Sequence, residues 1–257
     1  MQQLSPAAPV PADSAVPAGE DADAVARAAL DAVRRLAVHY GLWFAGAVER
    51  FGIEPALAME REAGDRLLPI LLDRLGRTLG FASPDGLPEP LLRLEPAQRE
   101  DLLRALAVIW LAADGVWFQA VEQRAGMDAA KAVNDGCWSA FSPLEAARIK
   151  ALVGLEDGGG PAALAEALRH RLYAAINRQE IEIEPDGSVV LWMRDCRVQS
   201  ARRRKGLPDY PCKSAGVVEY TSFAHTIDPR LECTCIACPP DPHPEGWYCA
   251  WRFRLAP

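Results

Sequence analysis

The sequence predicts an α+β fold in which a long helical region precedes a smaller module built of strands and one helix. Apolar residues recur at helical spacing in six segments, at residues 23–39, 64–79, 97–111, 116–124, 142–153 and 161–174. From residue 178 the pattern changes to the strict alternation that is typical of strands. Six of the seven cysteines lie within the last 62 residues, so the strand module also differs from the helical region in composition.

The helical region contains an internal repeat. The motif Gly-Leu-Trp-Phe at residues 41–44 returns as Gly-Val-Trp-Phe at residues 115–118, an offset of 74 residues, and Arg50 and Arg124 are related by the same offset. We therefore predict a tandem duplication, although two unrelated amphipathic helices that share a Trp-Phe pair would give a similar pattern. Only one motif follows an acidic residue, Asp114, so we expect the copies to differ in function.

Turn residues divide the chain further. Glycines at four positions are expected to end helices, and a Pro-rich stretch separates the two repeats. The N-terminal residues are rich in Pro, Ala and acidic residues and contain no Lys or Arg, so we expect a disordered tail. The predicted parts are the tail 1–22, the first helical repeat 23–82, the linker 83–96, the second helical repeat 97–176 and the cysteine-rich α+β module 177–257.

The cysteine-rich module should begin with a β-hairpin. Residues 180–184 alternate between acidic and apolar, Pro185-Asp186-Gly187 provides a turn, and residues 188–193 form a second apolar run. Residues 212–226 are compatible with a helix, and residues 230–237 and 247–255 alternate again. The predicted order is therefore strand, strand, helix, strand, strand.

Composition limits the classes of function. A formal net charge of -7 argues against broad binding to nucleic acid or to anionic membranes. No apolar run approaches the roughly 18 residues that a membrane span needs, and the N-terminus lacks the features of a secretory signal. We therefore expect a cytoplasmic protein that binds a small molecule and does not bind nucleic acid or membranes. A homodimer is also possible. In a reducing cytoplasm, clustered cysteines are more often metal ligands or reactive thiols than disulfides.

Four cysteines have the spacing of a metal site. Cys235 and Cys238 form a C-x2-C pair, and Cys212 and Cys249 lie in the neighbouring predicted helix and strand. These four thiolates are our predicted zinc ligands. Several alternatives remain open, because cysteines are also common small buried residues and other side chains could replace a ligand. The alternative ligands are Cys196, Cys233 and His243.

Other residues are candidates for catalysis and ligand binding. His243 lies in a Pro-rich loop near Asp241 and could act as an acid or base, or could be a solvated surface residue. Arg202 and Arg203 could bind the acidic group of a ligand, or could form a solvated face. We expect a pocket between the second helical repeat and the cysteine-rich module. Its apolar wall would come from two tryptophans that could also be plain core residues, Trp117 and Trp138.

Two family resemblances cover roughly residues 100–257. The Asp-Gly-Val-Trp-Phe motif at 114–118, Pro-Cys-Lys at 211–213 and Cys-Pro-Pro-Asp-Pro-His-Pro at 238–244 resemble a group of uncharacterised bacterial cytosolic proteins. That group is akin to the L-2-amino-thiazoline-4-carboxylic acid hydrolase family. Residues 212–216, 232–235 and 249–253 resemble the C-terminal part of the 4-vinyl reductase domain family. The second resemblance implies a ligand-binding module in which cysteines and an acidic residue can hold zinc.

Three functions compete on this basis. The first is a zinc-containing hydrolase that acts on a small acidic or heterocyclic molecule. A zinc ion with four cysteine ligands has no open position, so His243 or an acidic residue would then perform the chemistry. The second is a non-catalytic small-molecule-binding or sensor module with a structural zinc, and the third is an interaction scaffold. The sequence contains no DNA-binding or kinase pattern through which a sensor would act, which favours the enzyme.

Overall fold

The computed structural model describes residues 22–256, so the predicted tail lies outside the described residues except for its last residue. The chain divides into two compact units, with the boundary after Arg50. The first unit contains helix α1 (Ala22–Phe51), which continues as far as the first residue of the second unit. Within α1, the rings of His39 and Trp43 are in edge contact, with centroids 6.4 Å apart.

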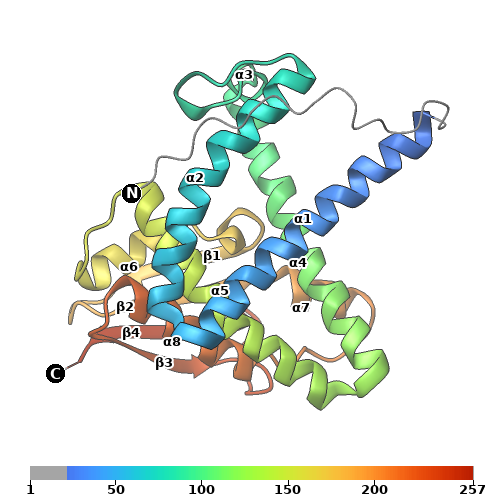
Figure 1. Ribbon diagram of the computed structural model, residues 1–257. Coiled ribbons are helices and arrows are strands. Elements are labelled where there is room, and N and C mark those ends of the chain that lie inside the picture. The colour runs from blue at the N-terminus through green and yellow to red at the C-terminus, as the bar shows by residue number, and fades with distance from the viewer. Residues whose placement is uncertain (1–21, 257) are drawn as a thin grey trace. The chain divides into compact units, whose positions relative to one another are not determined.

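The second unit begins with a series of helices and ends with a four-stranded antiparallel sheet (Figure 1). Its architecture confirms the predicted α+β class. None of the helices between residues 22 and 256 combines the length and the apolar character that a membrane span requires. The helices before the sheet are α2 (Ile53–Leu79), α3 (Glu89–Leu92), α4 (Pro96–Ala125), α5 (Met127–Val153) and α6 (Gly160–Arg169).

The long helices differ from the predicted segments in their bounds. The segments predicted at 97–111 and 116–124 are one helix, α4, because Gly115 sits within it without breaking it. A glycine inside a helix costs only about 1 kcal/mol, which packing along 30 residues can offset. Helix α4 starts at a reciprocal capping box in which the Gln98 side chain accepts from the Glu95 backbone N–H. Pro143 likewise lies inside α5.

The bounds of the four long helices repeat at the predicted offset. Helices α1 and α4 each have 30 residues and begin 74 positions apart, and α2 and α5 each have 27. The glycines that join each pair have similar backbone angles, with φ 85° and ψ 173° at Gly52 and φ 87° and ψ 171° at Gly126. Positive φ favours glycine, because other side chains rarely adopt it. These bounds agree with a duplication, which stays a prediction.

The C-terminal part of the second unit has the predicted order of elements and one additional helix. The sheet order is β1-β2-β4-β3, and all neighbouring strands are antiparallel. The additional helix is α7, which the sequence pattern did not predict. The elements are β1 (Arg178–Ile183), β2 (Val189–Asp195), α7 (Arg197–Arg204), α8 (Lys213–Ile227), β3 (Leu231–Ala237) and β4 (Cys249–Leu255).

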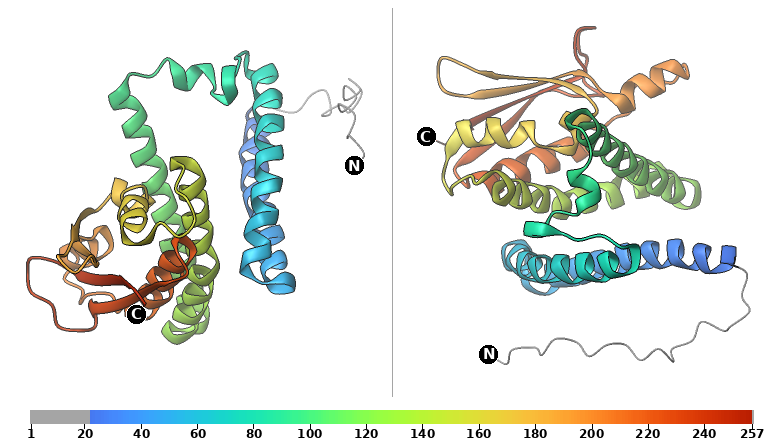
Figure 2. Two further views of the ribbon diagram at one scale, coloured as in Figure 1. Left: turned by 90° about the vertical axis from the view of Figure 1, so that its left-hand side faces the viewer. Right: turned by 90° about the horizontal axis from the view of Figure 1, so that it is seen from above.

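Helix α8 joins the sheet to the helical layer of the second unit. It packs against α5 on one side and against β3 on the other (Figure 2). Phe223 and Ile227 of α8 and Trp251 and Phe253 of β4 are fully buried in this layer. Burying a large apolar side chain contributes roughly 1.5–3 kcal/mol. This core therefore holds α8 against β4, where Trp251 contacts Gly216 and Tyr220, and both elements contribute to the site.

Candidate functional site

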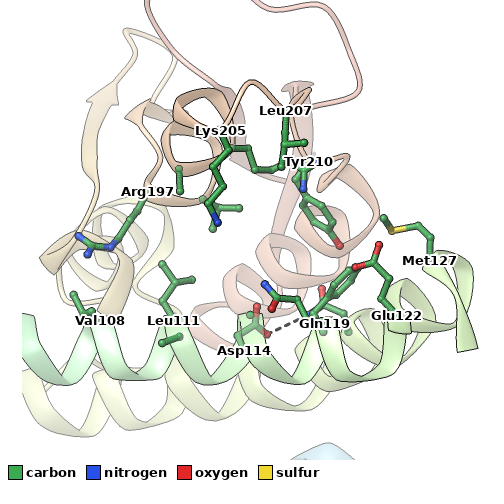
Figure 3. A pocket seen from close by; sticks show the side chains of 17 residues that line it. Val108, Leu111, Asp114, Gln119, Glu122, Met127, Arg197, Lys205, Leu207 and Tyr210 are labelled. Atoms are coloured by element: carbon green, nitrogen blue, oxygen red, sulfur yellow. Dashed lines mark hydrogen bonds between the residues drawn. The ribbon is translucent and has the colours of Figure 1, made fainter. Parts of the chain in front are cut away.

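Two adjoining chambers lie between α4, α5, α7 and the first turns of α8. The outer chamber has a volume of about 470 Å³, within the range of small-molecule pockets (Figure 3). The inner chamber has a volume of about 110 Å³ and lies against the cysteines. Four residues line both chambers and form the boundary between them: Asp114, Asn134, Val198 and Tyr210.

Opposite charges line the outer chamber. Arg197 and Arg202 come from α7, and Lys205 is the residue that follows its end. Asp114 and Glu122 come from α4, and Figure 3 shows both across the chamber from Arg197 and Lys205. The chamber therefore offers cations for an acidic group beside an apolar wall. That wall contains Val108, Leu111 and Phe118.

A buried triad of charges borders the inner chamber. Arg171 Nε donates to Glu145 Oε2 at 2.8 Å, and Arg171 Nη2 lies 2.7 Å from Glu219 Oε1. The second contact is an ion pair whose angles are not those of a hydrogen bond, so Glu219 Oε1 has no hydrogen-bond partner. Burial raises the pKa of Glu219 to about 7, although Arg171 opposes this shift. Glu219 also lines the inner chamber, so a carboxyl group that titrates near neutral pH faces it.

Asp114 is a second carboxyl group with an altered pKa. Burial raises its pKa, and a hydrogen bond of 3.1 Å donated by Asn134 Nδ2 opposes the increase. Residues from two helices hold it, because Asp114 lies in α4 and Asn134 in α5. Asp114 therefore stands at the boundary between the chamber that the cations of α7 line and the chamber that Glu219 lines.

Four cysteines from different elements line the inner chamber. The sulfur atoms of Cys212 and Cys238 are 3.5 Å apart, and Gln199 Nε2 lies 3.5 Å from Cys212 Sγ. The hydrogen bond from the Cys238 thiol, followed by that from Gln199, lowers the pKa of Cys212. Hydrogen bonds to Cys212 and Cys249 raise the pKa of Cys238, and burial raises the pKa of Cys196 to about 12. The four thiols therefore form one group, which we call the cysteine cluster: Cys196, Cys212, Cys238 and Cys249.

Three of the four predicted zinc ligands belong to this cluster. Cys235 does not line the chamber, and its neighbours include Lys213 and Asp241, while Cys196 lines the chamber instead. Two ligands about 2.3 Å from a tetrahedral zinc ion lie roughly 3.8 Å apart, which is compatible with the 3.5 Å between Cys212 and Cys238. In the described part of the chain, however, no group of three or more His, Cys, Asp or Glu is arranged as a metal site. The zinc site therefore stays a prediction.

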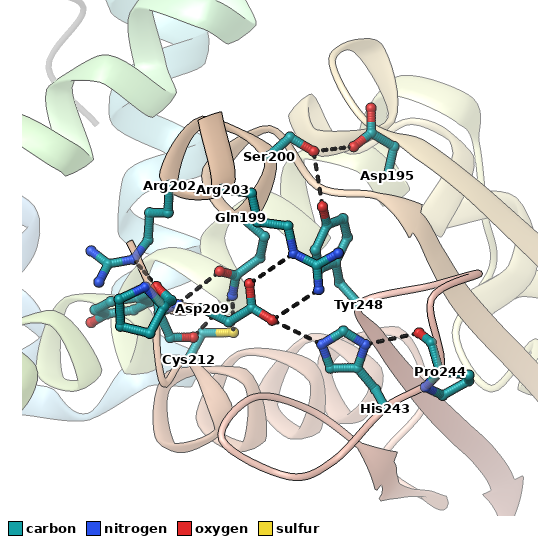
Figure 4. A network of polar contacts seen from close by, with 12 residues as sticks. Asp195, Gln199, Ser200, Arg202, Arg203, Asp209, Cys212, His243, Pro244 and Tyr248 are labelled. Carbon is teal, nitrogen blue, oxygen red and sulfur yellow. Dashed lines mark hydrogen bonds and ion pairs between the residues drawn. The ribbon is translucent and has the colours of Figure 1, made fainter. Parts of the chain in front are cut away.

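The predicted catalytic residues lie away from both chambers. His243 Nε2 is 3.0 Å from Asp209 Oδ2, and its Nδ1 is 3.0 Å from the carbonyl oxygen of Pro244 (Figure 4). Asp241 is not the partner of His243, because it forms an ion pair of 2.7 Å with Lys213. His243 therefore bridges Asp209 and Pro244, and neither His243 nor Asp241 lines a chamber, so their catalytic role stays a prediction.

Two of the four predicted ligand-binding residues line a chamber, and the other two do not. Trp138 lines the inner chamber and Arg202 lines the outer chamber. Arg203 instead donates to both carboxylate oxygens of Asp209, at 3.2 and 3.1 Å, and lines neither chamber. Trp117 is 69% exposed and also lines neither.

Sequence reasoning missed the residues of the inner chamber that carry its chemistry. Glu219 could have been found from its pattern, because it is one charged residue within the apolar run of residues 215–224. Trp251 and Asn177 give no comparable signal, since a tryptophan in a strand and an asparagine before one are both ordinary. Their role follows only from the chamber that they line.

A family model described as a family of unknown function (DUF6125) matches residues 92–255, which include every residue of both chambers. No curated protein matches the chain. No solved structure matches it either.

Proposed function

The chain belongs to this family of unknown function, DUF6125, and from the geometry of its site we propose that it hydrolyses a small organic acid. One observation carries the proposal: a chamber lined by cations adjoins a chamber that contains a buried carboxyl group and the cysteine cluster. Hydrolysis needs a site that holds the substrate and a group that moves a proton. The outer chamber would hold the substrate, and the inner chamber would supply the group that moves the proton.

The outer chamber would bind the acidic group of the substrate. Arg197, Arg202 and Lys205 supply charge-assisted hydrogen bonds, and a guanidinium can bind a carboxylate through two parallel bonds. Arg202 is already held in place, because its Nε donates to the carbonyl oxygen of Pro208 at 2.7 Å. The apolar wall beside these cations would contact the carbon skeleton, which directs the other end of the molecule toward the inner chamber.

In the inner chamber, Glu219 would act as the general base. Its pKa of about 7 suits proton transfer near neutral pH, where an efficient base is partly ionised. As water attacks the electrophilic carbon, a carbon–oxygen bond forms and Glu219 takes a proton from the water. Glu219 then returns that proton to the leaving group as the scissile bond breaks. Glu145 and Arg171 orient the carboxylate from outside the chamber.

The cysteine cluster would hold a zinc ion. Cys212, Cys238 and Cys249 are the three predicted ligands that line the inner chamber, and Cys196 is a further thiol beside them. If only these three thiolates were ligands, a bound zinc ion could supply Lewis-acid activation, whereas ligation by Cys196 as well would make the zinc structural. Zinc could have a structural or a catalytic role, and the position of the cluster on the cavity wall supports the catalytic role.

Metal analysis tests this assignment. We expect purified protein to contain about one zinc ion per chain, as thiolate zinc sites do. Cys238→Ser should lose the zinc and destabilise the sheet, because metal binding and folding are coupled. Cys137→Ser is the matched control, since Cys137 is exposed and outside the cluster, and it should retain the metal. Protein that is free of metal and fully stable would contradict the zinc assignment.

Kinetics with a panel of small acidic amides and esters test the hydrolase. Arg202→Gln should raise KM for these substrates on the order of tenfold, because one charge-assisted contact is lost. Arg204→Gln is the control, since Arg204 lies on the same helix but lines neither chamber. If the panel binds at the cavity without turnover, the alternative of a non-catalytic binding module is favoured. Absence of both binding and turnover would overturn the proposal.

A further inference from the structure

Two buried hydrogen-bond donors at the inner chamber have no partner. Trp251 Nε1 and Asn177 Nδ2 are both buried, neither has a hydrogen-bond acceptor, and both residues line the chamber. An unsatisfied buried polar group costs roughly 1–3 kcal/mol, so native folds carry few of them. Building on the proposed hydrolase, we infer that these two donors form the seat for a carbonyl oxygen of the substrate.

The orientation of both donors is fixed by their neighbours. Asn177 Oδ1 accepts from the backbone N–H of Arg197 at 2.9 Å, so the amide nitrogen is the end that remains free. The Trp251 ring packs against Gly216 and Tyr220. A Cβ at position 216 would lie 2.6 Å from Trp251 Cζ2, so glycine is required for this close approach. The seat is therefore organised before a ligand arrives.

The chemistry of the chamber selects the group that the seat accepts. An indole N–H can only donate, so its partner has to be an acceptor atom. Asp114 and Glu219 line the same chamber. Their carboxylates would repel a carboxylate of the ligand, so a neutral carbonyl group is favoured. The volume of about 110 Å³ has room for roughly three or four water molecules, so the group has to be compact. An amide or ester carbonyl satisfies all three conditions.

Together the two chambers define a class of substrate. The outer chamber takes a carboxylate or similar anion, and the inner chamber takes an amide or ester carbonyl a few atoms away. During attack by water, the carbonyl oxygen acquires negative charge. Donors that are held in place before the ligand binds would stabilise this charge without reorganisation. Trp251 and Asn177 would thus be catalytic residues of the oxyanion-hole type.

Binding can be tested without turnover by titrating the ¹⁵N-labelled protein with acetamide. Acetamide carries a neutral carbonyl, and we expect it to shift the Trp251 indole N–H signal, with a dissociation constant on the order of millimolar. Trp251→Phe identifies the signal among those of the seven tryptophans. Methylammonium, which only donates, should leave the signal unmoved, and acetate should bind more weakly than acetamide. A Trp251 signal that acetamide does not move would overturn the inference.

Kinetics then separate this inference from the hydrolase itself. Asn177→Asp keeps the acceptor for Arg197 but loses the free donor, and it should lower kcat about 100-fold with little change in KM. Trp192→Phe is the control, because its Nε1 already donates to Glu182 outside the chamber. Turnover that survives unchanged in Asn177→Asp and in a folded Trp251→Phe would refute the seat but keep the hydrolase. Acetamide binding that depends on both donors, without any turnover, would keep the seat and refute the hydrolase.

Discussion

Replacing Arg171 by methionine should lower the free energy of unfolding by about 3–5 kcal/mol. Arg171 is only 3% exposed and lies between the carboxylates of Glu145 and Glu219. Methionine fills a similar volume but leaves two buried acidic groups without a cation. Removing one partner of a buried ionic network is costly because the remaining charge keeps its desolvation penalty. Denaturant unfolding at pH 7 measures the effect.

Two further variants decide whether charge is the cause. Arg169→Met removes a more exposed arginine that pairs with Glu166 on the surface, and it should change stability little. Adding Glu145→Gln to Arg171→Met should recover part of the loss, since one of the two unpaired carboxylates is then gone. If Arg171→Met is as stable as the wild-type protein, the triad is not a structural element.

Replacing Glu219 by glutamine should reduce hydrolysis by on the order of 100- to 10,000-fold. Glutamine keeps the shape of the side chain but cannot take a proton from water. For the wild-type protein, turnover should rise with pH through about 7, because a general base has to be deprotonated and Glu219 titrates there. The residual rate of Glu219→Gln should lack this step. Glu232→Gln, in an exposed pair with Arg254, is the control and should retain full activity.

Glu219→Gln should also change how the free energy of unfolding depends on pH, and this effect can be measured without a substrate. The folded pKa of Glu219, about 7, lies above its ordinary value of 4.5, so the folded state binds this proton more tightly than the unfolded state. The stabilisation is complete below about pH 4.5 and is lost as the pH rises through about 7. Over this interval the wild-type protein should lose on the order of 3 kcal/mol that Glu219→Gln does not lose. Equal pH dependence in both proteins would show that Glu219 has an ordinary pKa.

The sequence determined most of the elements, because their signals are local. The alternation at residues 180–184 and 188–193 around Asp186-Gly187 predicted the β1–β2 hairpin. The helix predicted at residues 212–226 is α8 (Lys213–Ile227). Such patterns depend on which side chains alternate over a few residues, and a short stretch of chain contains that information.

Local signals were misleading where packing along a long element outweighed them. Gly115 and Pro143 usually interrupt helices, yet both lie within helices, α4 and α5. Helix α7 (Arg197–Arg204) was missed because its run of arginines gives no apolar period over eight residues. Its position matters for function, since it carries two of the cations of the outer chamber, Arg197 and Arg202.

Only the tertiary structure decided which side chains share the cavity. The spacing of the cysteines predicted a cluster, but a β-bulge between Cys235 and Ala237 interrupts the pairing of β3, and Cys196 lines the chamber in place of Cys235. Glu219 lies in α8 and Arg171 follows α6, far apart in the sequence, and their charges meet only because α8 packs against α6. The raised pKa of Glu219 and the unpartnered donor of Trp251 both result from burial. Burial depends on elements from the whole unit, so no local pattern encodes it.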